Sequence, residues 1–297
     1  MKQDRLERLK YVSAAVTYGT VGLLVRFVDL PSEAVAFYRG LLATPFILAY
    51  MRLRGIRPDL RAIRQNGGLL LLSGVLLGGN WIFLFAAYTR TTVAIASLCN
   101  YMAPLLVILL APPVLKERLD KRKLPFVALA FAGILLVSGV WNGSTADLPG
   151  AGMGLAGALC FAAIVLCNRK LRDITATDRT AVQLAVATLT ILPYVLLRNG
   201  TLPIPSDTRS LILLLVLGLF HTGFAYVLYF SGMANLPVQS VAILGYLEPA
   251  VSVLCSALFL QETMSFTGWI GALLILSAAV ISELIPSPKK IKKENEI

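Results

Sequence analysis

Residues 93–110 read VAIASLCNYMAPLLVILL and residues 238–255 read VQSVAILGYLEPAVSVLC, so one apolar segment occurs twice, 145 positions apart. Tyr101 and Pro104 in the first copy match Tyr246 and Pro249 in the second. A weaker pair, LLATPFILAY at 41–50 and AVATLTILPY at 185–194, has nearly the same offset. Two related copies predict a duplicated architecture in which each half of the chain forms the same structural unit.

The composition indicates that this unit lies in a membrane. Apolar residues make up 57% of the 297 positions and charged residues 14%, with a mean hydropathy of +0.76, more than a soluble domain can bury. Ten apolar blocks cover residues 9–28, 33–52, 68–88, 91–114, 124–141, 150–169, 180–197, 209–231, 237–260 and 266–285. Each approaches the roughly 20 residues of a spanning helix, and none alternates in polarity as barrel strands do. The sequence predicts an all-α integral membrane protein with ten transmembrane helices.

The ten blocks divide into two halves of five. Because five is odd, two related halves must enter the membrane in opposite orientations, as an inverted repeat. The predicted N-terminal five-helix repeat covers residues 1–141 and the C-terminal one residues 150–285, with a turn-rich polar loop between them. Residues 286–297 are charged and interrupted by proline, and we predict a disordered cytoplasmic tail there.

The net charge of +11 indicates membrane topology rather than nucleic acid binding. Of the 27 Lys and Arg residues, 22 fall in the termini and loops on the N-terminal side and 4 in the opposite loops. The positive-inside rule therefore predicts a multi-pass protein of the cell membrane with both termini in the cytoplasm. Glu117 lies in the basic loop KERLDKRK, whereas its counterpart Glu262 lies in QETMSFTG, which has no Lys or Arg.

These motifs resemble those of a known family. The sequences YMAP at 101–104 and YLEP at 246–249 are each followed, 13 residues after the proline, by Glu117 or Glu262. The first and sixth helices contain the matching stretches YGTVGLLVR at 18–26 and FAAIVLCNR at 161–169. Over residues 10–285 the chain resembles the EamA-type ten-helix transporters of the drug/metabolite transporter superfamily. The resemblance implies a central cavity lined mainly by helices 1, 3, 4, 6, 8 and 9.

Polar and aromatic side chains within these helices are the candidates for substrate binding. Ser97, Asn100, Tyr101 and Pro104 share one stripe of the fourth helix, and Pro249 repeats the structural kink in the ninth. Backbone groups freed by such prolines persist where they pack on protein or line a wet cavity. Interhelical hydrogen bonds, or an interfacial aromatic belt for Trp81, are the alternative roles. The predicted substrate-binding residues are Tyr18, Asn80, Trp81, Asn100, Tyr101, Phe161, His221 and Tyr246.

His221, Glu248 and Arg39 lie away from the ends of the predicted spans, where charge is costly and normally faces a cavity or a partner. His221 and Glu248 lie at similar depth and form a candidate proton-coupling pair. Tyr246 and Glu248 are about 200° apart on an α-helix, so they do not share one cavity unless Pro249 distorts the turn. Arg39 either extends to the outer interface or attracts an acidic group of the substrate. The first helix has no acidic residue between Tyr11 and Val25, which disfavours simple proton antiport through that helix.

These observations favour a secondary transporter that moves a small metabolite, an amino acid or a related amphipathic compound, across the cytoplasmic membrane. Efflux by alternating access is the expected mode. An alternative is a membrane-embedded enzyme or a scaffold, but the sequence offers no nucleophile with a base, no carboxylate pair and no metal-ligand spacing. We therefore predict no enzyme activity, catalytic residue, metal or cofactor. The expected partners are the small-molecule substrate and the lipid bilayer, with no nucleic acid, for a monomer or homodimer.

Overall fold

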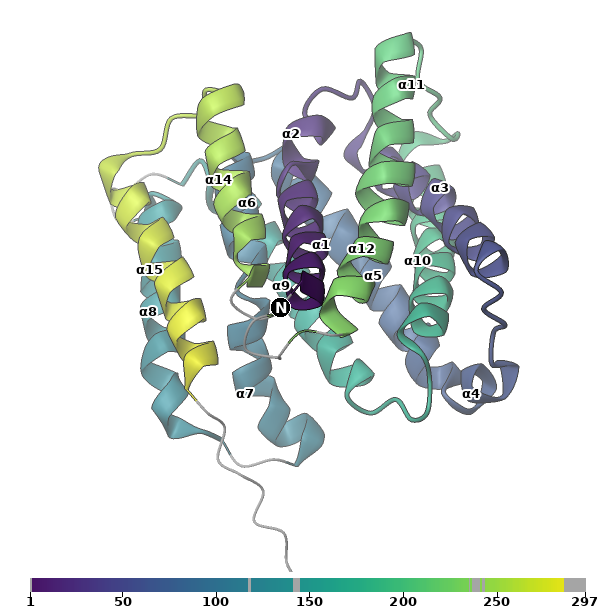
Figure 1. The fold of residues 1–297 in the computed structure, drawn as a ribbon. Helices are drawn as coiled ribbons and strands as arrows, with labels where there is room; N and C mark the ends of the chain where they lie inside the picture. Colours follow the sequence, from purple (N-terminus) through teal and green to yellow (C-terminus); the bar gives the residue numbers. More distant parts are fainter. Residues whose placement is uncertain are drawn as a thin grey trace, which may run out of the picture.

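The computed structural model describes residues 2–116, 119–140, 145–234, 236, 241 and 244–285, and the regular elements in these ranges are all helices (Figure 1). The first half contains α1 (Lys2–Gly19), α2 (Val21–Val25), α3 (Ser32–Leu53), α4 (Leu60–Gln65), α5 (Gly67–Tyr88), α6 (Val93–Asn100), α7 (Ala103–Leu115), η1 (Lys121–Lys123) and α8 (Leu124–Val137). The second half contains α9 (Leu148–Asn168), α10 (Ala176–Asn199), α11 (Thr208–Leu215), η3 (Val216–Phe224), α12 (Ala225–Ala234), α14 (Leu247–Phe259) and α15 (Phe266–Leu284). Glu117, Val238, Ala242 and the tail 286–297 lie outside the described residues.

The described part of every predicted apolar block is mainly helical. Within the described ranges, six stretches are long and apolar enough to cross a membrane, and Leu247–Phe259 and Phe266–Ser282 form shorter apolar helices. The first predicted span consists of α1 and α2, the fourth of α6 and α7, and the eighth of α11, η3 and α12. The prediction of an all-α membrane fold built from two five-helix repeats is confirmed.

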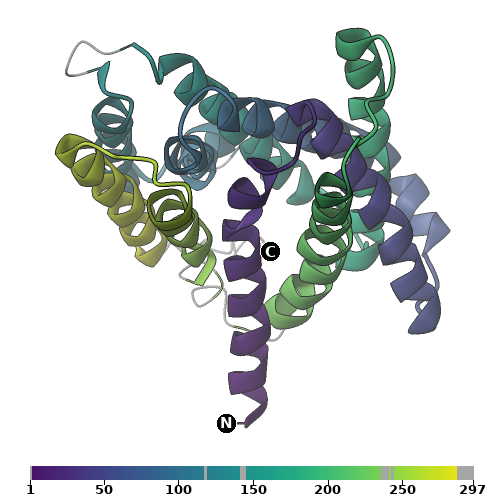
Figure 2. The same ribbon diagram turned by 90° about the horizontal axis from the view of Figure 1, so that it is seen from above.

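The helix contacts follow an approximate two-fold symmetry. Helix α5 packs on α9, and its counterpart α12 packs on α1. In the same way α10 packs on α5, and η3 packs on α3. The pairs α3–α10, α6–α14 and α8–α15 each join a helix to its own counterpart, and α1 lies between α14 and α12 (Figures 1 and 2). Because each repeat has an odd number of spans, this two-fold axis lies in the membrane plane.

The fourth span is broken rather than smoothly bent. Helix α6 ends at Asn100 and α7 begins at Ala103, so Pro104 stands in the first turn of a new helix. Pro249 likewise lies in the first turn of α14, which begins at Leu247. First-turn amide groups have no partner within their own helix, so a proline there removes no hydrogen bond. The repeated prolines therefore mark helix restarts near the middle of two symmetry-related spans.

The eighth span contains a π-helix that the sequence pattern did not predict. Over η3 the side chains reach back to carbonyl groups five residues earlier, with Thr222 donating to Leu217 at 2.8 Å and His221 Nδ1 lying 3.3 Å from Val216 O. A π-turn changes which side chains share a face, because it holds more residues per turn than an α-helix. The α-helical spacing assumed from the sequence thus misplaces the face that carries His221.

Candidate functional site

A small cavity lies where α1, α5, α6 and α14 meet, near the helix restarts. Its volume is ≈ 10 Å³, on the order of what one water molecule requires. A metabolite would therefore fit only after the surrounding helices move apart. The cavity is lined by Tyr18, Gly19, Leu84, Tyr88, Ser97, Asn100, Tyr101, Glu248 and Ser252.

The cavity is lined by one carboxyl group, that of Glu248, and by one enclosed hydroxyl group, that of Tyr18, which has no hydrogen-bond partner among the described residues. Tyr101 makes a side-chain hydrogen bond to Glu248, joining the break between α6 and α7 to the first turn of α14. The Tyr18 ring contacts those of Tyr226 and Tyr229, with centroids 5.9 and 6.0 Å away. An unpaired buried hydroxyl is costly, so this group is available to a ligand or a water molecule.

Asn80 and Asn100, predicted from the sequence, lie together beside the cavity. Asn80 Nδ2 donates to Asn100 Oδ1 at 3.0 Å and to the Gly157 carbonyl at 2.9 Å. These bonds join α5, α6 and α9, so one amide links both repeats. Asn100 lines the cavity, whereas the buried Asn80 supports it from behind.

The Asn80→Ala substitution is expected to destabilise the protein by about 1–3 kcal/mol, because two buried acceptors lose their donor. Thermal unfolding of the purified protein in detergent measures this effect. Asn199→Ala is the matched control, since Asn199 bonds Val195 O and Glu33 at a helix end that is only half-buried. Equal melting temperatures for the two variants would contradict the bridging role of Asn80.

Arg39 does not extend to the interface, which corrects one of the two interpretations of its sequence position. Its side chain is buried, with 7% of the residue exposed. Nε donates to Thr222 Oγ1 in η3 at 2.6 Å, and the guanidinium carbon lies 4.8 Å from the Trp81 ring centroid and 5.5 Å from that of Phe85. One aromatic face of Trp81 is therefore occupied by an internal cation.

The predicted pairing of His221 with Glu248 is not among the contacts in the structure. His221 Nε2 lies 2.9 Å from Thr20 Oγ1, and its other ring nitrogen faces Val216 O. Glu248 instead accepts from Tyr101. His221 nevertheless lies near the site, because the residue that it contacts, Thr20, directly follows the cavity residue Gly19.

The remaining predicted residues lie away from this cavity. Phe161 is 43% exposed on α9, and Tyr246 is buried in the hydrophobic core beside α14. Glu248 lines the cavity and Tyr246 does not, which agrees with their angular separation on a helix. Tyr88 and Ser252 line it but were not predicted. A tyrosine near a helix end and a serine among apolar residues carry no distinctive pattern, so only their neighbours reveal them.

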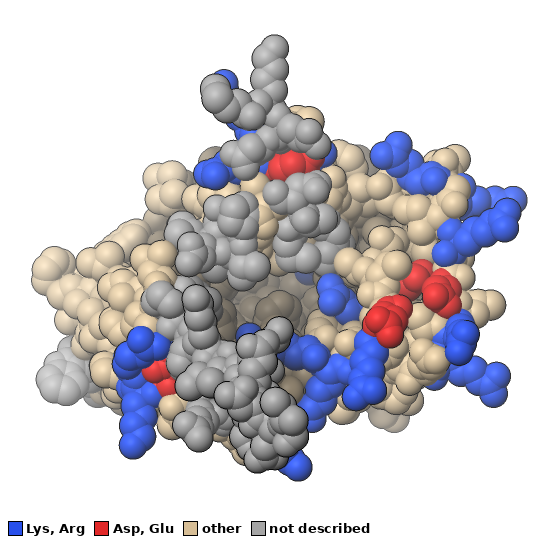
Figure 3. All heavy atoms as spheres, turned by 60° about the horizontal axis from the view of Figure 1, so that its bottom comes forward, with Lys and Arg blue, Asp and Glu red and all other residues tan. Residues whose placement is uncertain are grey.

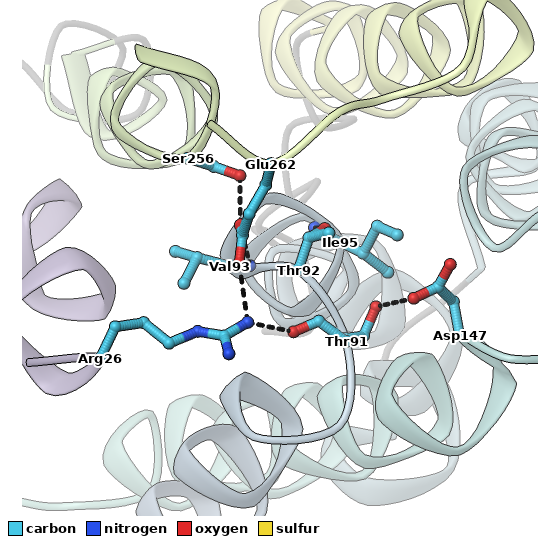
Figure 4. Close-up of polar contacts among 8 residues, drawn as sticks. All are labelled: Arg26, Thr91, Thr92, Val93, Ile95, Asp147, Ser256 and Glu262. Atoms are coloured by element: carbon cyan, nitrogen blue, oxygen red, sulfur yellow. Dashed lines mark hydrogen bonds and ion pairs between the residues drawn. The ribbon is translucent and has the colours of Figure 1, made fainter. Parts of the chain in front are cut away.

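A polar network joins the two repeats at one end of the molecule, and Figure 4 shows its hydrogen bonds and ion pair. Arg26 bonds both the Thr91 carbonyl and Glu262, each at 2.7 Å. The other oxygen of Glu262 accepts from the Val93 amide at 2.8 Å and from the Ser256 hydroxyl at 2.5 Å. Glu262 of the second repeat thus caps α6 of the first repeat, at the end where the helix dipole favours an anion.

The closure has a second layer one helical turn deeper. Ser97 and Ser252 share a hydrogen bond of 2.6 Å between α6 and α14, and the Tyr88 hydroxyl lies 3.4 Å from Ser97. Ser97 and Ser252 are four residues from Val93 and Ser256, which is about 6 Å along each helix. Thr91 also donates a hydrogen bond of 2.6 Å to Asp147, the residue directly before α9. Two layers of polar contacts therefore join the repeats at this end of the cavity.

The opposite end differs in both charge and shape. In Figure 3, which brings the lower face of Figure 1 forward, Lys and Arg side chains gather around a hollow. Helix α4 lies at this end, and its Arg61 and Arg64 are exposed (Figure 1). The basic end is thus the hollowed end, whereas the end held by Arg26 and Glu262 is closed.

Two inverted five-helix repeats around an occluded polar cavity define the architecture of a membrane transporter. The chain belongs to the EamA-like transporter family, which it matches over residues 9–139 and 148–283. The resemblance inferred from the YMAP and YLEP motifs is therefore confirmed.

Several curated proteins are similar to this chain over most of its length. The uncharacterized transporter YxxF of Bacillus subtilis is 27% identical over 95% of this chain and 90% of its own. Protein PecM of Dickeya dadantii is 31% identical over 75% and 77%, and a probable amino-acid metabolite efflux pump of Salmonella typhimurium is 29% identical over 72% and 76%. One solved crystal structure has a TM-score of 0.65 over 94% of this chain and 97% of the other, at 21% identity, which shows that the fold is shared.

Proposed function

We propose that this transporter exports a small amphipathic metabolite, an amino acid or a closely related compound, by alternating access. The observation that carries the proposal is the cavity between the repeats, which is closed at one end by paired polar layers, in a molecule whose opposite end is hollowed and basic. Rocking one repeat against the other would open the closed end. The similarity to a probable amino-acid metabolite efflux pump supports both the substrate class and the direction.

The lining of the cavity suits a ligand with both polar and apolar parts. Tyr18, Tyr88 and Tyr101 provide aromatic surface and hydroxyl groups, and Asn100 provides an amide. Glu248 is the carboxyl group of this lining. We assign the proton-coupling role to Glu248, because a half-buried carboxyl group that a tyrosine can stabilise is able to exchange a proton as the cavity opens. His221, which contacts Thr20 next to the cavity residue Gly19, is the second candidate for this role.

The test of this function is transport by the purified protein in lipid vesicles. A panel of metabolites is first screened for thermal stabilisation, because a ligand that binds the folded state raises its stability. Stabilising compounds are then assayed for counterflow, with Glu248→Gln as the variant expected to lose proton-driven uptake while retaining exchange. A protein that binds compounds but moves none would favour the alternative of a membrane-embedded enzyme or a scaffold.

We further propose that both termini lie in the cytoplasm of the cell and that the hollowed basic end faces inward. A cysteine at Arg64 should then react with a membrane-impermeant thiol reagent only in inside-out vesicles, and a cysteine at Ser206 only in intact cells. Both positions are exposed, so access depends on the side of the membrane alone. The background lacks the four natural cysteines. Labelling of both positions from one side would contradict the inverted arrangement.

A further inference from the structure

Arg39 is a buried cation without an anionic partner. Among the described residues its polar contact is the single bond to Thr222, and no carboxylate lies within the 4.0 Å of an ion pair. A charged group within a membrane-spanning helix is costly unless it is paired. Contact with the rings of Trp81 and Phe85 recovers only part of this cost. The position therefore needs a reason beyond packing.

The position of Arg39 connects it to the cavity. Its guanidinium group packs on Trp81 and Phe85 of α5, the helix that also brings Leu84 and Tyr88 to the cavity wall. Arg39 belongs to the first repeat and Glu248 to the second. The region between the repeats therefore holds one group of each charge, with the unpaired Tyr18 hydroxyl also present.

The contacts that hold Arg39 in place leave the two terminal nitrogens of its guanidinium group available to a ligand. Thr222 holds Nε, and the two aromatic rings fix the plane of the guanidinium group. Within the described part of the chain, no hydrogen bond or ion pair engages the two terminal nitrogens. A planar guanidinium group binds a carboxylate through two parallel hydrogen bonds, and a group already fixed in orientation loses little entropy on doing so.

We propose that Arg39 recognises the carboxylate of the transported substrate and restricts transport to compounds that carry one. The inference rests on the proposed transport function and names a chemical requirement of the substrate. In the open state the carboxylate binds the terminal nitrogens of Arg39, and the Tyr18 hydroxyl donates to the same group. An amino acid or a related organic acid satisfies this site, whereas its carboxamide lacks the charge.

The test compares L-amino acids with their carboxamides, pair by pair, on the full-length protein. Binding is measured by thermal stabilisation in detergent, and transport by counterflow in vesicles. The wild type is expected to prefer each acid over its amide by about 10–100-fold, the loss that accompanies removal of a charge-assisted hydrogen bond. Arg39→Gln should bring this ratio close to one, and Arg39→Lys should retain a part of it, since lysine keeps the charge without the planar fork.

Arg209→Gln is the matched control, because it removes the same charge from an exposed arginine that does not line the cavity. The guanidinium carbon of Arg209 lies 4.9 Å from the centroid of the Phe27 ring. An unchanged ratio in Arg39→Gln would overturn the inference and leave Arg39 with a packing role. A wild type that transports acids and amides equally would also overturn it, even if Arg39→Gln fails to fold. A wild type that transports none of these compounds would instead count against the proposed function.

Discussion

Replacing Gly19 with alanine is expected to reduce transport about tenfold. A Cβ atom at Gly19 would lie 2.6 Å from the Glu248 carbonyl oxygen and 2.6 Å from Val251 Cβ, both closer than atoms normally approach. One of these contacts is backbone, so α1 and α14 must separate. Overpacking of this kind costs about 1–3 kcal/mol, and a rise of about 1.4 kcal/mol in the barrier slows transport tenfold. The helices forced apart carry Tyr18 and Glu248, which line the cavity.

The initial rate of counterflow in vesicles measures this effect, at a protein amount corrected for folded material by size-exclusion chromatography. Gly152→Ala is the control, because Gly152 is exposed on α9 and a Cβ atom there meets nothing within 4 Å. Alanine is also the better helix former, so the control variant should be at least as stable as the wild type. Wild-type transport by Gly19→Ala would show that the close approach of α1 and α14 is not needed during the cycle.

Removing Arg26 is expected to open the closed end of the cavity. Arg26→Ala deletes the 2.7 Å ion pair with Glu262 and the bond to the Thr91 carbonyl. Glu262→Ala also removes the cap on the Val93 amide, so its effect should be larger. A loss of about 1.4 kcal/mol from the closed state shifts the equilibrium between closed and open tenfold. Both variants should therefore populate the open conformation more often than the wild type.

A cysteine at Ser97 reports this opening, because Ser97 is buried one turn below the network. Its rate of reaction with a membrane-impermeant thiol reagent on intact cells should rise about tenfold in Arg26→Ala. Arg90→Ala is the control, since Arg90 is exposed in the loop between α5 and α6 and the network does not include it. Equal labelling rates for Arg26→Ala and Arg90→Ala would mean that the network stabilises the loops without governing access.

The tertiary arrangement explains why only part of the candidate site was predictable. Tyr18, Asn100 and Tyr101 line the cavity, and Asn80 supports Asn100 from behind. Phe161 is the sequence counterpart of Tyr18, yet its side chain faces outward. The symmetry of the repeats is therefore broken at the level of side chains. A repeated motif predicts a repeated helix, but the packing of each copy decides whether a given residue faces the cavity or the surroundings.

Arg39 and His221 illustrate a second limit. In a soluble helix the polar face indicates which side meets water, but in a membrane helix the lipid-facing and core-facing sides are both apolar. No periodicity therefore predicts where Arg39 points, and its partner Thr222 lies 183 residues away in the sequence. The π-helix over Val216–Phe224 also turns His221 toward Thr20 rather than toward Glu248.

The sequence by itself determined the number and order of the helices, their duplication and the family, because hydrophobic length and the 145-residue offset are properties of the chain alone. Only the tertiary structure decided which end of the cavity is closed and which charges face one another. Arg26 meets Glu262, and Tyr101 meets Glu248, across a boundary between two repeats that enter the membrane in opposite directions. Such contacts depend on how two apolar surfaces pack, and the free energy of that packing is spread over many side chains rather than encoded in any single motif.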